Sequence, residues 1–313
     1  MKIVVLDPAV DNVNAGDEII SSSVQGIPKL GPDDVTRLTT HRVLRASERK
    51  LVSEADLVVL SGTNALSSRM ERFRQWFVDP DLALRMSNKL LLLGVGWWQY
   101  QQPPNMYTRA LFRRILTRRL PHSTRDQYTS DRISSLGFEN LMTGCPTMWN
   151  LGADCQQPLG NNDRALITVT DYKRQDPEID RRWISVVKEN YSRVGIVGMG
   201  PGDESHFTRL GISGVEWKGQ GVDALEAELP GADFIGTRLH AGVRALQRGR
   251  PAAVLAVDNR AVEISRSTGL NVVDRADTLG IHRAIRSESA PAPLTLNKTA
   301  INQWLQEFGK AVG

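Results

Sequence analysis

Short apolar runs alternate with amphipathic stretches along most of the chain, and this alternation predicts an α/β fold. The apolar runs have the length of strands buried on both faces, which lack the polar alternation of half-exposed strands. Ten strands are expected: Lys2–Asp7, Val35–Leu38, Leu57–Leu60, Lys89–Leu93, a segment ending at Asp126, one near Leu141, Ala165–Val169, Val194–Val197, Phe234–Ile235 and Ala252–Val257, with a further candidate at Leu270–Val273.

Helical spacing of apolar residues marks most of the connections between these strands. The expected helices are a run from Ile19, Ala46–Ala55, Ser67–Phe77, Thr108–Leu120, a segment ending at Leu136, Arg181–Tyr191, a helix after Gly236 and Asn297–Val312. The helix after Gly236 ends at Gly249 and Pro251, as a C-terminal glycine and a following proline predict.

One break in this pattern predicts two domains. Leu151–Asp163 is rich in Gly, Pro, Asn and Asp and has no periodicity, which is typical of an interdomain linker. The alternation of strands and helices restarts after it. We therefore expect one domain over 1–155, a second over 156–296, and a terminal helix over 297–313.

Composition indicates a soluble globular protein in a reducing compartment. The chain has 313 residues, 41% of them hydrophobic and 24% charged, with a formal charge of +4. This diffuse charge suits anionic substrates or an anionic membrane surface, and it argues against a nucleic-acid partner. Cys145 and Cys155 have no metal-ligand spacing, and MKIVVLD has the pattern of a strand rather than a signal peptide. The expected location is cytoplasmic.

The stretch Thr108–Leu120 places five arginines among apolar residues and predicts a basic amphipathic helix. A solvated charged face is the favoured interpretation. The alternative is contact with an anionic membrane surface at the inner face of the membrane, or with a lipid pyrophosphate.

The most informative polar residues lie where the strand at Phe234–Ile235 gives way to a helix. Thr237, Arg238 and His240 occupy this junction. A helix start favours an anion, Arg238 adds a guanidinium with the geometry to bind phosphate or carboxylate, and His240 adds a proton that can move near neutral pH. The alternative for His240 is a capping or solvated residue.

Polar loops also follow strands of the first half, at the sheet edge where open α/β sheets bind ligands. Asn14, Gly16 and Asp17 follow the first strand, although Asp17 could simply cap its helix. A second loop follows Leu57–Leu60 and contains Gly62, Thr63 and Asn64; Arg125 either points toward the same cleft or pairs with Asp126. The loop Gly198–Asp203 departs from the dinucleotide fingerprint, and no phosphate-binding P-loop sequence occurs.

Several motifs together resemble the polysaccharide pyruvyl transferase family. They are N-A-G-D-E after the first strand, S-T-R-D followed by Ser130 and Leu136-Gly137, G-T-R-L-H at Gly236–His240, and G-R-P-A-A-V-L-A-V-D. The sequence departs from the family pattern at Ser61–Leu66, where many relatives carry a glycine run. The resemblance implies a GT-B-like fold: two doubly wound Rossmann-type domains facing a cleft, with a C-terminal helix crossing back to the first domain.

The resemblance also implies an activity: transfer of a pyruvyl group from phosphoenolpyruvate to sugar hydroxyls as a pyruvate ketal, in exopolysaccharide or cell-surface glycan biosynthesis. The acceptor would be a sugar or a lipid-linked oligosaccharide, with no metal or cofactor besides the donor. The expected catalytic residues are His240 and Asp17. The expected donor-binding residues are Arg238, Arg125 and Thr237, and the expected acceptor-binding residues are Asn14, Gly16, Gly62, Thr63 and Asn64.

Two other functions stay open at this point. One is a GT-B glycosyltransferase that uses a nucleotide sugar, with Glu263 as the carboxylate that holds the ribose. The other is a non-catalytic glycan-binding protein of the same fold, because fold alone does not choose among activities.

Overall fold

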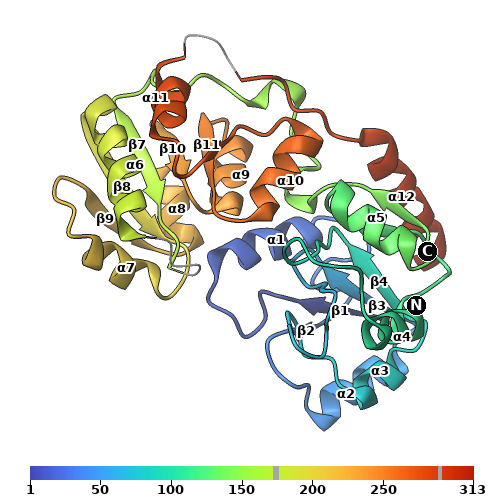
Figure 1. Ribbon diagram of the computed structural model, residues 1–313. Coiled ribbons are helices and arrows are strands. Elements are labelled where there is room, and N and C mark those ends of the chain that lie inside the picture. The colour runs from blue at the N-terminus through green and yellow to red at the C-terminus, as the bar shows by residue number, and fades with distance from the viewer. Residues whose placement is uncertain (172–175, 288–290) are drawn as a thin grey trace. The chain divides into compact units, whose positions relative to one another are not determined.

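A computed structural model describes residues 1–171, 176–287 and 291–313 (Figure 1). Contacts divide the chain into two units, each built on a parallel sheet. Unit 1 comprises Met1–Asn12, Ile20–Trp149 and Leu296–Gly313, and unit 2 comprises Val13–Ile19 and Asn150–Thr295. The division into domains over 1–155 and 156–296 remains a prediction, which limited proteolysis can test.

Unit 1 contains a four-stranded parallel sheet in the order β2-β1-β3-β4 and a separate parallel pair, β5-β6. The strands are β1 (Ile3–Asp7), β2 (Thr36–Thr39), β3 (Leu57–Ser61), β4 (Leu90–Leu93), β5 (His122–Thr124) and β6 (Asn140–Met142). The helices are α1 (Ala15–Gln25), whose first turn belongs to unit 2, α2 (Ala46–Glu54), α3 (Pro80–Arg85), α4 (Met106–Ile115), α5 (Gln127–Ser135) and α12 (Lys298–Val312), with a short 3₁₀ turn at Pro146–Met148.

The last helix, α12, completes the core of unit 1. Ile301, Trp304 and Phe308 are buried against strands β1, β3 and β4. The Trp304 indole N–H donates to the Pro121 carbonyl at 3.0 Å, and its ring lies 5.8 Å from that of Trp149. The expected return of the C-terminal helix to the first domain is therefore confirmed.

Unit 2 contains a six-stranded parallel sheet in the order β12-β11-β10-β7-β8-β9. The strands are β7 (Arg164–Thr168), β8 (Arg193–Gly198), β9 (Glu216–Gln220), β10 (Ala232–Gly236), β11 (Ala252–Ala256) and β12 (Val272–Asp274). The helices are α6 (Pro177–Asn190), α7 (Asp203–Leu210), α8 (Val222–Glu228), α9 (Leu239–Gln247), α10 (Asn259–Thr268) and α11 (Thr278–Arg286), with a 3₁₀ turn at Ala153–Cys155.

Helices cover both faces of the unit 2 sheet, which explains why its strands are continuously apolar. Side chains of α6 and α11, such as Trp183 and Ile285, pack with alternate residues of β7, β10 and β11. On the other face α9 approaches so closely that a methyl group at Gly242 would lie 2.6 Å from Val254. The predicted α/β class with two parallel sheets is confirmed.

The helix predicted over Ser67–Phe77 is wrong. This segment makes turns, and other segments take up the backbone N–H groups that a helix would use. The Ser68 N–H donates to Gln101 Oε1, and the Met70 N–H donates to Thr108 Oγ1 at 3.0 Å. Trp76 is then buried in the core instead of lying on one side of a helix.

Several other boundaries differ from the expected ones. Helix α1 begins at Ala15 instead of Ile19, and α6 begins at Pro177 instead of Arg181. Helix α4 ends at Ile115 because the following chain bonds to β4, through the Thr117 N–H and the Leu90 carbonyl at 2.9 Å. The short helices α3, α7, α8, α10 and α11 were not predicted, because stretches of only six to ten residues give few repeats of a helical pattern.

The predicted linker, Leu151–Asp163, is partly packed on unit 2. Gln156 is buried and bonds to the backbone of Gly269, Asn271 and Ala292, and Leu159 lies in the core. Residues 288–290 lie outside the described residues. None of the described helices is both long and apolar enough to cross a bilayer.

Candidate functional site

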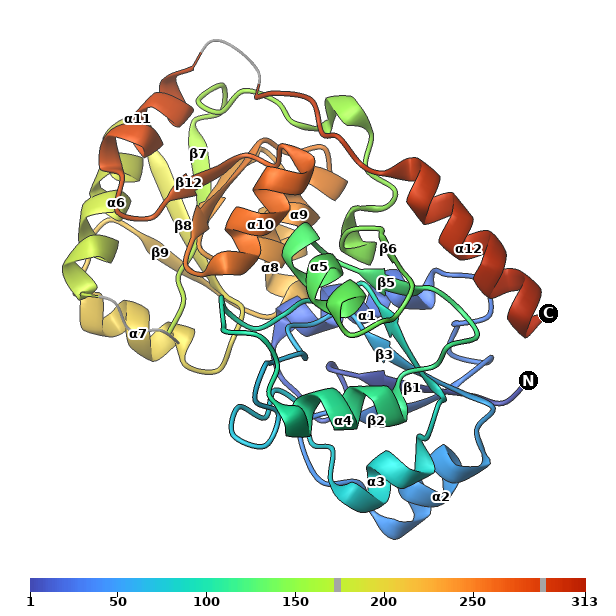
Figure 2. The same cartoon turned by 45° about the vertical axis from the view of Figure 1, so that its right-hand side comes forward.

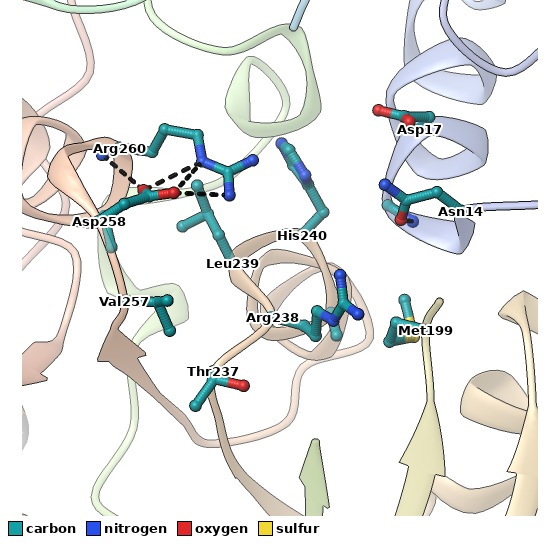
Figure 3. Close-up of a pocket in the computed structure, with 13 residues that line it drawn as sticks. Asn14, Asp17, Met199, Thr237, Arg238, Leu239, His240, Val257, Asp258 and Arg260 are labelled. Atoms are coloured by element: carbon teal, nitrogen blue, oxygen red, sulfur yellow. Dashed lines mark hydrogen bonds and ion pairs between the residues drawn. The ribbon is translucent and has the colours of Figure 1, made fainter. Parts of the chain in front are cut away.

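A pocket with about 490 Å³ of empty space, part of it open to solvent, lies at the carboxyl ends of β10 and β11 (Figure 3). The first residues of α1, α9 and α10 form most of its wall, together with Met199 from the loop after β8. A helix start carries unpaired peptide N–H groups and the positive end of the dipole. Three such starts around one pocket favour an anionic ligand.

The pocket brings together six of the residues that the sequence predicts for the site: Asn14, Gly16, Asp17, Thr237, Arg238 and His240. All six belong to unit 2, because the first turn of α1 is grouped with it. The predicted donor residues Arg238 and Thr237 thus line the same pocket as both predicted catalytic residues, His240 and Asp17, and two of the predicted acceptor-binding residues, Asn14 and Gly16.

The turn after β10 is held against the end of β7. A methyl group at Gly236 would lie 2.3 Å from Thr168 Oγ1, so the two strands can approach this closely only with glycine at that position. The Thr237 hydroxyl lies 2.8 Å from that of Thr170 and also donates to the Thr168 carbonyl. The side chain of Thr237 therefore fixes the turn from which Arg238 and His240 project.

Arg238 is held in place by carboxylates of unit 2. Its Nη2 donates to Asp203 Oδ1 and lies 3.5 Å from Asp171 Oδ1, and its Nε donates to the Val169 carbonyl at 3.2 Å. The side chain of Arg238 is only 8% exposed. Its direction is therefore fixed before a ligand binds, and its charge is partly balanced by neighbouring residues.

Asp203 is the residue that the sequence interpretation missed. It is fully buried, and its second oxygen accepts the N–H groups of Met199 and Gly200 at 2.8 and 2.9 Å. A methyl group at Gly200 would lie 2.7 Å from Nη2 of Arg238. The glycine-rich loop Gly198–Asp203 thus positions an arginine. Its place at the end of a strand and its acidic last residue were the signals that could have revealed this role.

His240 lies in the first turn of α9 and packs against the first turn of α1. Its Nδ1 is 3.5 Å from the point that a methyl group at Gly16 would occupy. The Asn14 side chain accepts the Gly16 N–H at 3.0 Å, and the Ala15 N–H donates to the Met199 carbonyl at 2.9 Å. Asn14, and not Asp17, therefore caps α1, while Asp17 stands in its first turn (Figure 3).

A second cation, Arg260, lines the pocket and was also missed. It pairs with Asp258 through two contacts of 3.0 Å from its Nε and one of 2.8 Å from Nη2 (Figure 3). Asp258 also caps α10 by accepting the Arg260 N–H at 3.0 Å. Glu263, the expected ribose-binding carboxylate, is not among the lining residues; it is buried and accepts from Arg266 at 2.8 Å.

The remaining predicted site residues belong to unit 1. Arg125 is 2% exposed and donates to Asn64 Oδ1 at 2.5 Å, and its contact with Asp126 is 3.3 Å. A methyl group at Gly96 would lie 1.9 Å from its Nη2. The interpretation of Arg125 as the ion-pair partner of Asp126 thus corresponds to an observed contact, and its predicted direction toward a cleft stays a prediction. The Thr63 carbonyl accepts the Gly96 N–H at 2.8 Å, and Gly62 lies against the Gly94 carbonyl.

Metal ligands are not grouped anywhere in the described ranges: no set of three or more His, Cys, Asp or Glu side chains there could hold a metal ion.

Comparison with known families matches residues 14–259 to the polysaccharide pyruvyl transferase family. The match covers most of the chain and includes every residue of the pocket except Arg260 and Ala261. The chain belongs to the polysaccharide pyruvyl transferase family. Membership of this family indicates a transferase. No curated protein matches the chain at the sequence level.

Solved structures resemble this pyruvyl transferase family member in fold. The UDP-GlcNAc 2-epimerase of Methanocaldococcus jannaschii, in complex with UDP-GlcNAc and UDP, is 12% identical over 98% of this chain and 99% of that chain, with a TM-score of 0.51. S. aureus MnaA with UDP is 9% identical over 100% and 96%, with a TM-score of 0.53. A glycosyltransferase of Rickettsia africae is 10% identical over 99% and 97%, with a TM-score of 0.49. The first two of these matches indicate the fold alone, an α/β fold with two parallel sheets.

Proposed function

We propose that this protein transfers the pyruvyl group of phosphoenolpyruvate to two hydroxyls of a sugar, and that the donor binds in the unit 2 pocket. The observation that carries the proposal is the pairing of a pre-oriented Arg238 with His240 at one helix start, in a chain of the pyruvyl transferase family. Phosphoenolpyruvate carries a carboxylate and a phosphate, which suit a pocket walled by helix starts and lined by two guanidinium groups.

The reaction requires one proton on carbon and two new carbon–oxygen bonds. Protonation of the methylene carbon turns it into a methyl group and makes the adjacent carbon electrophilic. One sugar hydroxyl attacks that carbon, phosphate leaves with its bridging oxygen, and a second hydroxyl closes the ketal. Of the two protons that the hydroxyls release, one balances the proton on carbon and the other leaves with phosphate.

In this proposal His240 delivers the proton to carbon. A bound dianion favours the protonated form of a nearby imidazole, so the donor itself would help to keep the acid charged. Arg238 would bind the donor's anionic groups, and Thr237 would support it by fixing the turn.

Asp17 is proposed to orient or deprotonate an acceptor hydroxyl, with Asn14 and Gly16 beside it. Its alternative role is to stabilise the start of α1. Glu18 supplies a matched comparison, because it stands in the same first turn but does not line the pocket. Asp17→Asn lowers turnover far more than Glu18→Gln if Asp17 acts on the acceptor. Equal effects on turnover and stability would leave only the helix-start role.

The nucleotide-sugar alternative expects Glu263 to bind the ribose. Glu263 instead pairs with Arg266 and does not line the pocket. A thermal-shift series with phosphoenolpyruvate, UDP-GlcNAc and other nucleotide sugars compares the two donors. Stabilisation by phosphoenolpyruvate alone supports the proposal. Stabilisation by a nucleotide sugar alone would replace it with glycosyl transfer.

Phosphate release from phosphoenolpyruvate with candidate glycans is the decisive assay. His240→Gln should lower turnover roughly 100- to 10,000-fold, because an amide keeps a hydrogen bond but delivers no proton. Arg238→Ala should mainly weaken donor binding. His282→Gln is the matched control, because His282 is a partly buried histidine of the same unit outside the pocket. Near-normal turnover of His240→Gln would remove His240 as the acid, and glycan binding without any phosphate release would identify a non-catalytic binder.

A further inference from the structure

Helix α4 has an outer face that is at once basic and apolar. Thr108, Leu111, Phe112 and Ile115 face the core of unit 1. The exposed residues are Met106, Tyr107, Arg109, Ala110, Arg113 and Arg114. Met106 is 87% exposed and Tyr107 is 46% exposed, so a thioether and part of an aromatic ring face solvent at the start of the helix.

The segment Ser68–Phe77 lies beside the start of α4. Two hydrogen bonds hold it there: the Met70 N–H donates to Thr108 Oγ1 at 3.0 Å, and Asn105 Nδ2 donates to Glu71 Oε1 at 2.7 Å. It adds three exposed arginines, Arg69, Arg72 and Arg74. We call these three arginines and the six exposed residues of α4 the α4 face; Figure 2 shows α4 on the outside of unit 1, beside α3.

Acidic residues are almost absent from this part of the chain. No Asp or Glu occurs between Asp81 and Asp126, and Glu71 is the only acid within Ser68–Phe77. Within the ranges that the structure describes, the three arginines of α4 form no ion pair. Their charge is therefore available to an anionic partner to a greater degree than that of Arg42 or Arg49, which are paired with carboxylates.

We propose that the α4 face binds the surface of an anionic lipid bilayer. Six arginines match the charge of anionic headgroups, and Met106 and Tyr107 supply apolar groups that can enter the interfacial region between headgroups and acyl chains. Proteins bind nucleic acid through positive charge and, for single strands, through aromatic rings on which the bases stack. Neither mode of binding uses an exposed aliphatic side chain such as that of Met106. An exposed thioether at the start of a basic helix suits a lipid interface instead. The proposal is independent of the proposed reaction.

Flotation of the full-length protein with vesicles tests this proposal. Vesicles of phosphatidylcholine are compared with vesicles in which about one-third of the lipid is phosphatidylglycerol, at low and at raised salt. The protein should float with the anionic vesicles only, and raised salt should weaken binding without abolishing it. Equal recovery with neutral and anionic vesicles overturns the proposal.

Two sets of substitutions separate the charged and apolar contributions. Replacing Arg109, Arg113 and Arg114 together by Gln should lower the partition coefficient roughly 100-fold, since each arginine near an anionic surface contributes about a fivefold factor. Met106→Ser with Tyr107→Ser should remove the part of binding that survives raised salt. All five residues are exposed, so circular dichroism should show an unchanged fold.

The matched control removes the same charge from exposed positions of unit 2 by replacing Arg182, Arg193 and Arg209 with Gln. It should change vesicle binding by less than about threefold, because only diffuse attraction is lost. An equal loss in the control and α4 variants overturns the proposal in favour of net charge. Binding of duplex DNA that depends on the same α4 arginines, with vesicle binding indifferent to Met106 and Tyr107, overturns it in favour of a general polyanion site.

Discussion

At the scale of single residues, the surroundings of Arg238 decide what it can do. An arginine at a helix start is a common anion-binding device. Here Asp203 and Asp171 fix the guanidinium, and the buried Asp203 also holds the backbone of the loop after β8. A carboxylate beside an anion site lowers the net positive charge of the site. It also holds the arginine in one orientation, so less conformational entropy is lost when the ligand binds.

Asp203→Asn should therefore raise the KM for phosphoenolpyruvate roughly 10- to 100-fold, the range for one charge-assisted hydrogen bond, and change kcat much less. Steady-state phosphate release with donor titration measures both constants. Asp171→Asn is the matched comparison, because its contact with Arg238 is longer at 3.5 Å, and its effect on KM should be smaller. An Asp203→Asn enzyme with a normal KM and a lowered melting temperature would limit Asp203 to folding the loop.

At the scale of elements, strands β4 and β5 are joined through a histidine side chain. The Leu92 N–H donates to Nδ1 of the buried His122 at 3.2 Å. This bond requires a neutral imidazole, because a protonated nitrogen cannot accept. Burial lowers the pKa of His122 from 6.5 to about 4, and a smaller opposing effect comes from a hydrogen bond with the Thr117 backbone.

The stability of unit 1 should consequently fall as the pH drops from 6.5 to about 4. In that window the unfolded chain protonates His122 and the folded chain does not, so each pH unit removes up to about 1.4 kcal/mol, and the loss ends below the folded pKa. Urea unfolding across this window measures it. His122→Asn keeps an acceptor near Nδ1 and cannot be protonated, so its slope should be smaller by that amount. Identical slopes for both proteins would show that His122 contributes nothing to the pH dependence.

Element prediction from the sequence succeeded where an element's own pattern is strong. The apolar runs of β1, β3, β4, β7 and β11 and the face of α12 were found within a few residues. It failed at Ser67–Phe77, where Thr108 and Gln101 from later in the chain bond the backbone.

At the scale of the whole molecule, the chain passes between units near Asn12–Val13, Ile19–Ile20, Trp149–Asn150 and Thr295–Leu296. Gly152, Ala153 and Asp154 are exposed, whereas Gln156 and Leu159 beyond them are buried. Backbone that is exposed and weakly packed is where proteases cut first. The first part of the predicted linker is thus the expected place of the first cut.

Limited proteolysis should cut first at Gly152–Asp154 and leave two compact fragments. These fragments should stay together in gel filtration, because the second one carries α12, whose Trp304 and Phe308 are buried in unit 1. Mild denaturant should then release them. First cuts inside Phe234–Val257, or uniform protection through the linker, would contradict the two-domain prediction.

The sequence by itself determined the class of fold, the family and the junction that carries Arg238 and His240. Buried strands, helix starts and short motifs each depend on residues that are close together in the sequence. Only the tertiary structure decided which residues meet there. Asp203 contacts Arg238 although the two are 35 positions apart, and the first turn of α1, near the N-terminus, lies beside His240. The strand order β12-β11-β10-β7-β8-β9 brings Asp203 and Asp258 to the same sheet edge as Arg238. No local pattern encodes that order, because it arises from packing between segments that are distant in the chain.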